Sequence, residues 1–328
     1  MMAQIWRYIF RLTLAAGLVY VLVSASSFGW MLFPLFWQNQ AELQGVAVSL
    51  EKSVRHLSEE IGVRNYSRPD NLEKAARYVE RSFEAAGLPV ESWEYEAQGQ
   101  KFRNVVAKYQ NNPSPEYWVV GAHYDSCFNP GADDNASGVA GLLWLADALK
   151  KVPLKANILF VAFTNEEPPF FASSSMGSRV FVQAAQERRL VIRGAIVLEM
   201  IGYYSNQWFS QKYLPPMGLF YPNRGNFVAL VGSFGSGRLV ESIQADFSKQ
   251  KYILTRSVLA PAWVPGLNLS DHASFWAAGL PAVMVTDTAF LRNSNYHQST
   301  DTFGRLDYNK MAAVVAGLKS AVISLSER

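Results

Sequence analysis

Histidine and carboxylate side chains recur in this sequence directly after apolar runs that have the length of β-strands. They are His123 and Asp125 after Tyr117–Ala122, Glu166 and Glu167 after Asn157–Phe163, Glu199 at the end of Gly194–Glu199, and His297 in the loop after Ala282–Val285. A further carboxylate, Asp134, lies just before a predicted helix. Because the carboxyl ends of parallel strands meet in one crevice, these side chains are expected to lie together. Mixed imidazole and carboxylate ligands suit zinc, and two ions can share one carboxylate.

The spacing within this set suggests separate roles. Asp125 stands two residues after His123, a spacing with which a carboxylate orients a metal-bound imidazole, and Asp301 forms a similar candidate pair with His297. Of the adjacent Glu166 and Glu167, one can bind metal while the other takes a proton from metal-bound water.

Each element also has an interpretation without chemistry. A His-x-Asp pair can lie on a surface, Asp133-Asp134-Asn135 can cap the following helix, and Asn165-Glu166-Glu167 can form a solvated turn. Glu199 resists such an explanation, because a carboxylate that ends a buried strand is expensive when unpaired. A metal site accounts for all of these elements at once.

Strand-like and helix-like segments alternate after residue 41, which predicts one α/β domain over residues 41–328. Its expected architecture is a doubly wound, mainly parallel sheet flanked by helices. The predicted strands are Val90–Tyr95, Arg103–Tyr109, Tyr117–Ala122, Asn157–Phe163, Gly194–Glu199, Phe227–Val231 and Ala282–Val285. The predicted helices are Glu42–Ile61, Asp70–Ala86, Ala136–Leu149, Ser178–Ala185, Gly237–Ser248 and Asp307–Ser324. The segment Tyr203–Tyr221, with seven aromatic residues, is expected to form a long loop over the site or to pack on the sheet.

Residues 1–40 are predicted to form a membrane anchor. No charged residue occurs from Leu12 to Ala41, a length sufficient to cross a bilayer, and Arg7 and Arg11 precede it. The two arginines favour a cytoplasmic N-terminus and an exported body. A signal peptide cleaved after Val23-Ser24-Ala25 and a buried soluble helix are the alternatives.

Composition excludes several classes of protein. The 328 residues are 49% hydrophobic and 17% charged, which excludes a disordered chain. Thirty Lys and Arg residues nearly balance 27 Asp and Glu residues without a basic run, so no nucleic-acid partner is expected. Cys127 is the only cysteine, which excludes an internal disulfide framework.

In its motifs the chain resembles the M28 family of zinc peptidases, which includes leucyl-type aminopeptidases and has glutaminyl cyclases as close relatives. The resemblance runs in order from about residue 50 to the C-terminus. It is carried by Gly121–Ser126, Gly131–Gly138, Asn165-Glu166-Glu167, Leu198–Gly202, Ser270-Asp271-His272 and Tyr296-His297.

The resemblance implies a role for each of these residues. Asp134 would bridge two zinc ions, with His123 and Glu199 completing the shell of one ion and Glu167 and His297 that of the other. Glu166 would be the general base, and Tyr296 would help to hold the oxyanion of the tetrahedral intermediate. Asp125 and Asp301 would support the ligands, whereas His272 is expected near the site without an assigned role.

Two departures from the family bear on the substrate. The family's aminopeptidases usually carry Asp at the position of Glu199, which leaves the preference for a free N-terminal amine open. The segment Pro168–Met176 is longer than in aminopeptidases and shorter than in glutaminyl cyclases, and with Tyr203–Tyr221 it is expected to shape the substrate pocket.

These features together predict a membrane-anchored, zinc-dependent exopeptidase. The expected activity is that of an aminopeptidase on peptides at the exported face, periplasmic or extracellular. The alternatives are a glutaminyl-cyclase-like acyltransferase that works with one zinc ion and a catalytically inactive binding ectodomain. One or two zinc ions are expected, with two favoured.

Overall fold

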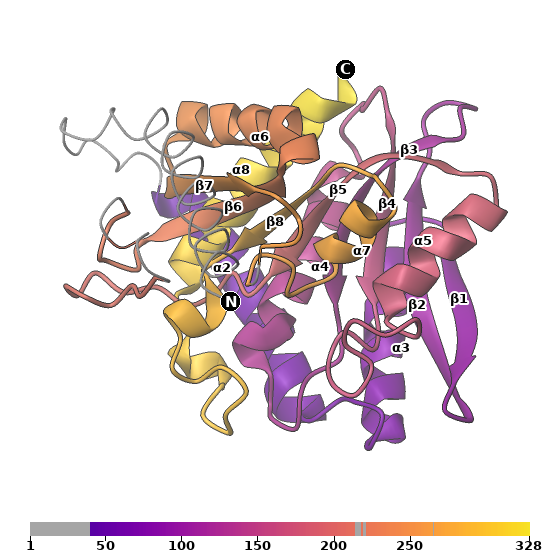
Figure 1. Ribbon diagram of the computed structural model, residues 1–328, viewed down its shortest axis with the longest axis horizontal. Helices are drawn as coiled ribbons and strands as arrows, with labels where there is room; N and C mark the ends of the chain where they lie inside the picture. Colours follow the sequence, from indigo (N-terminus) through magenta and orange to yellow (C-terminus); the bar gives the residue numbers. More distant parts are fainter. Residues whose placement is uncertain (1–39, 214–217, 219–220, 265) are drawn as a thin grey trace, which may run out of the picture.

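The central strands of the fold are apolar on both sides because helices cover both faces of the sheet. In β4 (Asn157–Phe163), Phe160 packs into the core on one face while Leu159 and Val161 pack into the core on the other. This alternation follows from the period of two along a strand. The computed structural model describes residues 40–213, 218, 221–264 and 266–328, and Figure 1 shows the sheet crossing the molecule between its helices.

Eight strands form one mixed sheet in the order β1-β2-β4-β3-β5-β8-β6-β7. The strands other than β4 are β1 (Val90–Ala97), β2 (Gln100–Tyr109), β3 (Glu116–His123), β5 (Val191–Glu199), β6 (Phe227–Ser233), β7 (Leu254–Ala260) and β8 (Ala282–Thr286). The four central strands β4, β3, β5 and β8 are parallel to one another. Their carboxyl ends therefore share one edge of the sheet, where ligands bind in open α/β folds.

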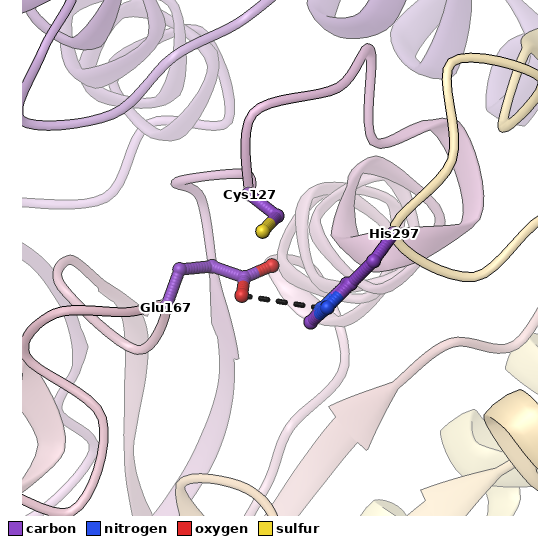
Figure 2. Close-up of side chains that lie close together, drawn as sticks. All are labelled: Cys127, Glu167 and His297. Atoms are coloured by element: carbon purple, nitrogen blue, oxygen red, sulfur yellow. Dashed lines mark ion pairs between the residues drawn. The ribbon is translucent and has the colours of Figure 1, made fainter.

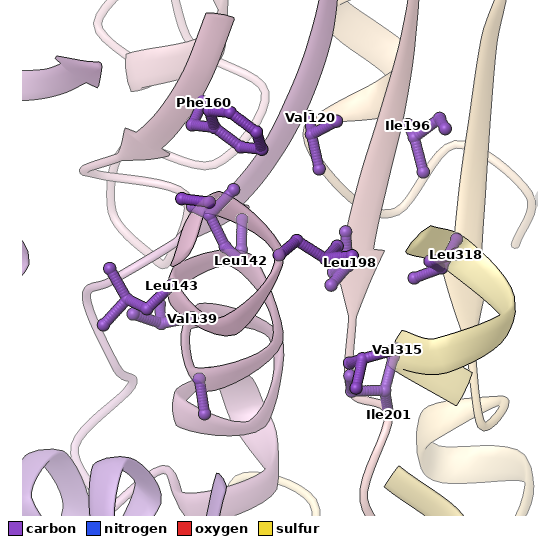
Figure 3. Packing of buried hydrophobic residues seen from close by; sticks show 14 of the residues in the cluster. Val120, Val139, Leu142, Leu143, Phe160, Ile196, Leu198, Ile201, Val315 and Leu318 are labelled. Carbon is purple, nitrogen blue, oxygen red and sulfur yellow. The ribbon is translucent and has the colours of Figure 1, made fainter. Parts of the chain in front are cut away.

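Helices lie in two layers. The α-helices of one face are α2 (Gln40–Arg55), α3 (Pro69–Ala85), α4 (Gly138–Leu149), α6 (Gly237–Gln250) and α8 (Tyr308–Ser326), and a π-helical turn, His56–Ile61, continues α2. Figure 3 shows part of this core, in which Leu142 of α4 and Leu318 of α8 lie near Leu198 of the sheet. The other face is covered by α5 (Gly177–Glu187) and α7 (His272–Ala277).

The predicted mainly parallel sheet is confirmed, with antiparallel pairs toward its two edges. β1 and β2 are antiparallel to each other, and β2 is antiparallel to β4. A two-residue turn joins β1 to β2, and both of its residues, Gln98 and Gly99, have positive φ, as a tight hairpin requires. On the other side β6 runs antiparallel to β8 while pairing in parallel with β7, a strand that the sequence analysis did not predict.

The predicted anchor over residues 1–40 lies outside the described residues, apart from Gln40 in α2. Among the helices of the described part of the chain, none combines the length and the apolar character needed to cross a bilayer.

Candidate active site

The predicted site residues meet at the carboxyl edge of the central strands. His123 is the last residue of β3, Glu199 is the last residue of β5, and Glu166 and Glu167 follow β4 in the first turn beyond it. His297 comes from the loop that follows β8. All five side chains lie within one connected set of close contacts.

Asp134 lies between the two histidines and offers one carboxylate oxygen to each. Its Oδ1 is 3.3 Å from Nε2 of His123, and its Oδ2 is 3.1 Å from Nε2 of His297. Nε2 of His123 is also 3.4 Å from Oε2 of Glu199, and Nε2 of His297 is 3.3 Å from Oε2 of Glu167. The arrangement has the form of two ligand groups that share one carboxylate.

The two groups differ in burial. His123, Asp134 and Glu199 are buried, and their ligand atoms lie within 4.8 Å of one another. The second group contains Glu167, His297 and, in addition, Cys127, with ligand atoms within the same distance. Figure 2 shows the three side chains of this group pointing toward one another. The position of Cys127 at the site was not predicted from the sequence.

The residues present fit a metal centre. Both ring nitrogens of His123 are buried without a hydrogen-bond partner, as is Oε1 of Glu167. Buried polar atoms of this kind are expensive unless something else satisfies them. Imidazole nitrogens and carboxylate oxygens are ligands that zinc accepts, so a zinc ion in each group would satisfy Nε2 of His123 and the free oxygen of Glu167.

The electrostatics indicate carboxylates crowded in a medium of low dielectric constant. Burial raises the pKa of Glu167 to about 7, with the charge of Asp134 adding to the effect. Burial lowers the pKa of His297, but its contacts with Asp134, Cys127 and Glu167 outweigh that and raise it to about 12. The pKa of Asp134 falls below its usual value, because the two histidines outweigh its burial. A cation is favoured at both ends of the Asp134 carboxylate.

Glu166 lies beside the two ligand groups rather than inside either of them. Its Oε2 is 4.0 Å from Nε2 of His123, and its side chain is almost fully buried. Burial raises its pKa well above the usual range; His123 opposes this shift, and the charges of Glu199 and Glu167 add to it. A carboxylate with a raised pKa at this position is suited to exchange a proton with a reacting molecule.

Asp125 fixes the turn that carries the two glutamates. Its Oδ1 accepts a hydrogen bond of 3.2 Å from the backbone amide of Glu166, and its Oδ2 accepts one of 3.1 Å from that of Glu167. Its distance to Nδ1 of His123 is 3.5 Å, longer than an ordinary hydrogen bond. Asp125 therefore holds the backbone of the turn more firmly than it holds the imidazole that the sequence analysis paired with it.

Asp301 makes the same contact with the loop of Asp134. Its two carboxylate oxygens accept hydrogen bonds from the amides of Asp133 and Asp134, at 2.9 and 3.2 Å. The predicted pairing of Asp301 with the ring of His297 is replaced by this contact, because Asp301 faces the peptide backbone. In the same loop Gly131 has a φ of 59°, and a Cβ there would lie 2.3 Å from the carbonyl oxygen of Asp134, so a side chain at this position would displace the loop.

The capping alternative applies to Asn135 and not to the two aspartates before it. Oδ1 of Asn135 accepts a hydrogen bond from the amide of Gly138, the first residue of α4. Asp133 instead accepts hydrogen bonds from the amide of Gly202 and from the Nδ2 of Asn293. The side chain of Asp134 faces the two histidines and does not cap the helix.

Ser270 is a site residue that the sequence analysis overlooked. Its hydroxyl donates a hydrogen bond of 2.6 Å to Oε2 of Glu199 and so orients that carboxylate. The sequence signal for Ser270 is its position in Ser270-Asp271-His272, one of the motifs that carry the family resemblance. His272 of the same motif is also buried. Its Nε2 donates a hydrogen bond to the carbonyl of Leu267, and its ring packs edge-on against Trp276.

A largely apolar pocket opens beside the site. Glu199 and Tyr296 lie on its wall, and the ring of Tyr296 stacks on that of His297 with 3.8 Å between the ring centroids. The other lining residues are mainly aromatic and aliphatic, among them Tyr213, Tyr221, Phe227, Ala229, Val231, Met284 and Phe290. The segment Tyr203–Tyr221 was predicted to shape the pocket, and two of its residues, Tyr213 and Tyr221, line it.

The predicted contribution of Pro168–Met176 to this pocket is not found. The described lining residues include none of that segment. Its Phe170 is buried against Phe102 and Tyr66, with ring centroids 5.3 and 5.9 Å apart, because the aromatic side chain gains more from the core than from solvent.

Comparison with known proteins identifies the fold and the family. A model of peptidase family M28 matches residues 104–322. The chain is 42% identical over 279 residues to the uncharacterized protein YfbL of Escherichia coli, covering 82% of this chain and 85% of YfbL.

Two solved structures share the fold at low sequence identity. A zinc aminopeptidase from Bacillus subtilis superposes with a TM-score of 0.66 at 16% identity, covering 84% of this chain and 94% of the other. A glutaminyl cyclase from Bacteroides thetaiotaomicron superposes with a TM-score of 0.63 at 17% identity, covering 85% of this chain and 97% of the other.

Proposed function

The chain belongs to peptidase family M28, and on that premise we propose that it is a zinc-dependent aminopeptidase that removes N-terminal residues from peptides. The observation that carries the proposal is the Asp134 carboxylate, which presents one oxygen to His123 and the other to His297. A shared carboxylate between two ligand groups supports a centre for two ions. A cyclase that works with one ion does not need the second group.

Three of the proposed ligands, Asp134, Glu167 and Glu199, have a hydrogen-bond partner that fixes them. His123, Asp134 and Glu199 would hold one ion, and Ser270 orients Glu199. Glu167, His297 and the second oxygen of Asp134 would hold the other, and Asp125 fixes the backbone of Glu167. Zinc, when bound, lowers the pKa of a coordinated water to about 7 and polarises the carbonyl to be attacked.

Glu166 is proposed to move the proton. Its carboxylate would take a proton from the attacking water and deliver it to the amine that leaves. Its raised pKa suits it to hold that proton between the two transfers. The backbone bond to Asp125 keeps Glu166 in place through both steps.

Tyr296 and the apolar pocket are proposed to position the substrate. Tyr296 is stacked on His297 and lies on the pocket wall with Glu199, where its hydroxyl would donate to the oxyanion. The aromatic and aliphatic lining supports a preference for large apolar side chains at the residue that is removed.

The test is a panel of short peptides incubated with the full-length chain and zinc, with products followed by mass. We expect release of single N-terminal residues, fastest for large apolar ones, and no release from peptides whose N-terminus is acetylated. Release of C-terminal residues, or of residues from acetylated peptides, would overturn the aminopeptidase assignment. A product lighter by one ammonia from peptides that begin with Gln would instead support the cyclase.

We also propose that residues 1–40 anchor the enzyme in a membrane with the catalytic domain on the exported face. The charge-free stretch from Leu12 to Ala41, preceded by Arg7 and Arg11, supports this arrangement. Membrane fractionation followed by protease treatment of intact cells with a permeable outer envelope tests it. The body is expected to sediment with membranes and to be digested, and a body protected until the cells are lysed would overturn the orientation.

A further inference from the structure

Cys127 lies at one of the two ligand groups although the family's ligand pattern does not require it. Its sulfur, a carboxylate oxygen of Glu167 and a ring nitrogen of His297 all lie within 4.8 Å of one another. In Figure 2 the Cys127 side chain points toward the space between the other two side chains. The thiol is partly exposed, so the position is open to an ion from solvent.

The backbone around Cys127 is fixed by its neighbours. The carbonyl of Cys127 accepts a hydrogen bond of 2.7 Å from Nδ2 of Asn65, and the amide of Ser126 donates one of 3.0 Å to the carbonyl of Arg64. Arg64 is itself fully buried and donates to the carbonyls of Tyr124 and Gly131 at the two ends of this loop. The sulfur is therefore presented to Glu167 and His297 by an ordered segment.

A second observation at the same place indicates a ligand. Oε1 of Glu167 is buried and has no hydrogen-bond partner, and the residue as a whole is only 3% exposed. Its other oxygen faces His297. A buried carboxylate oxygen without a partner costs free energy unless a cation or a donor satisfies it.

We propose that the Cys127 thiolate is an additional ligand of the metal ion held by Glu167 and His297. This inference rests on the proposed function, because it assumes that the second group binds an ion. With Asp134 the set becomes one sulfur, one nitrogen and two oxygens, four protein ligands in all. The thiol proton is released to solvent when the metal–sulfur bond forms.

The two ions would then have unequal environments. His123, Asp134 and Glu199 supply three protein ligands, which leaves a position open, as in catalytic zinc sites. The group with Cys127 supplies four, the number found in structural zinc sites. A thiolate also favours zinc and cobalt over magnesium and manganese, so this group is expected to bind its ion more selectively.

Cobalt substitution of the full-length protein tests the proposal without relying on activity. The chain is stripped of metal with a chelator and titrated with Co²⁺ while its absorption is recorded. We expect a sulfur-to-cobalt charge-transfer band in the near ultraviolet that saturates at one ion per chain. In Cys127→Ser and Cys127→Ala this band is absent and one ion binds at least about 10-fold more weakly. His297→Ala, which keeps the thiol, is expected to lose the same band.

Because Cys127 is the only cysteine, a thiol reagent gives a second readout at a single position. Zinc is expected to slow the modification of Cys127 at least about 10-fold, by the loss of free thiolate. Binding of two cobalt ions without the band, or equal modification rates with and without zinc, would overturn the ligation and leave the aminopeptidase standing. Failure of the wild-type chain to bind any metal would overturn both.

Discussion

Oδ2 of Asp125 accepts a hydrogen bond of 3.1 Å from the backbone amide of Glu167, a proposed metal ligand that lies 42 residues later in the chain. The other oxygen of the same carboxylate accepts from the amide of Glu166. One buried aspartate thus fixes the proposed base and a proposed ligand through their backbones, and Asp301 does the same for Asp133 and Asp134. Both turns of the site depend on a carboxylate that need not touch a metal ion.

Asp125→Asn is expected to lower kcat/KM by about 10- to 100-fold, because the amide replaces one of two acceptors with a donor that faces a backbone N–H. Kinetics on an apolar N-terminal peptide, with zinc content measured in parallel, checks this. Asp147→Asn, an exposed aspartate of α4, is the control for loss of charge. Wild-type kinetics and zinc content in Asp125→Asn would show that the turn holds without its carboxylate.

Ser270→Ala removes the hydrogen bond to Glu199 and leaves that carboxylate free to turn. We expect zinc affinity at the His123 group to fall by about 10-fold, the lower range for loss of a group that orients a ligand. Competition with a chelator measures the affinity. Ser274→Ala is a matched control, because Ser274, in α7, is also buried but forms its hydrogen bond with Ser178. Equal losses in the two variants would assign the effect to packing.

Ala229→Phe is expected to fill the apolar pocket from β6. Hydrolysis of peptides that begin with Leu or Phe should fall by at least about 10-fold relative to peptides that begin with Ala, since the lost space no longer accepts a large side chain. The ratio of the two kcat/KM values is the measurement, and the Ala peptide serves as the internal control. An unchanged ratio would place the side-chain pocket elsewhere.

The buried imidazole of His272 is expected to make the fold less stable in acid. Burial lowers its pKa to about 4 against 6.5 in the unfolded chain, while its bond to Leu267 opposes the shift. Below pH 6.5 the imidazole becomes protonated in the unfolded chain, whereas in the folded chain it stays neutral until about pH 4. The free energy of unfolding therefore falls as the pH is lowered between these two values. At pH 4.5 the loss is roughly 2–3 kcal/mol.

Denaturant unfolding of wild type and His272→Gln at pH 7 and pH 4.5 measures that loss, with other groups cancelling in the comparison. The free energy of unfolding of wild type should drop more than that of the variant, by roughly 2–3 kcal/mol. Equal drops in both proteins would mean that His272 is protonated in the fold.

Much of the fold could be predicted because its central strands carry a strong signal. Asn157–Phe163 is predicted with the bounds that β4 has, and every residue in it is buried. β7 was missed because Leu254–Ala260 is half-buried at the sheet edge and mixes Thr, Arg and Ser with its apolar residues. The hairpin of β1 and β2 was not recognised as antiparallel, although Gln98-Gly99 fits a two-residue turn.

The ligand candidates, and Asp125 and Asp301 as their supports, could be chosen from the sequence, but the contacts that these two aspartates make could not. Nothing in the spacing of Asp301 and His297 shows that Asp301 faces the amides of a loop 167 residues earlier. The contacts of Ser270 with Glu199 and of Cys127 with the His297 group likewise join distant parts of the chain. Such contacts follow from the packing of loops rather than from a local pattern.

Turnover by Glu166→Gln, measured together with its zinc content, tests the central claim most directly. The substitution keeps the size of the side chain and removes the carboxylate that would move the proton. We predict that zinc content stays at the wild-type level while kcat falls by about 10²- to 10⁴-fold. Wild-type turnover in a fully zinc-loaded Glu166→Gln protein would contradict the account.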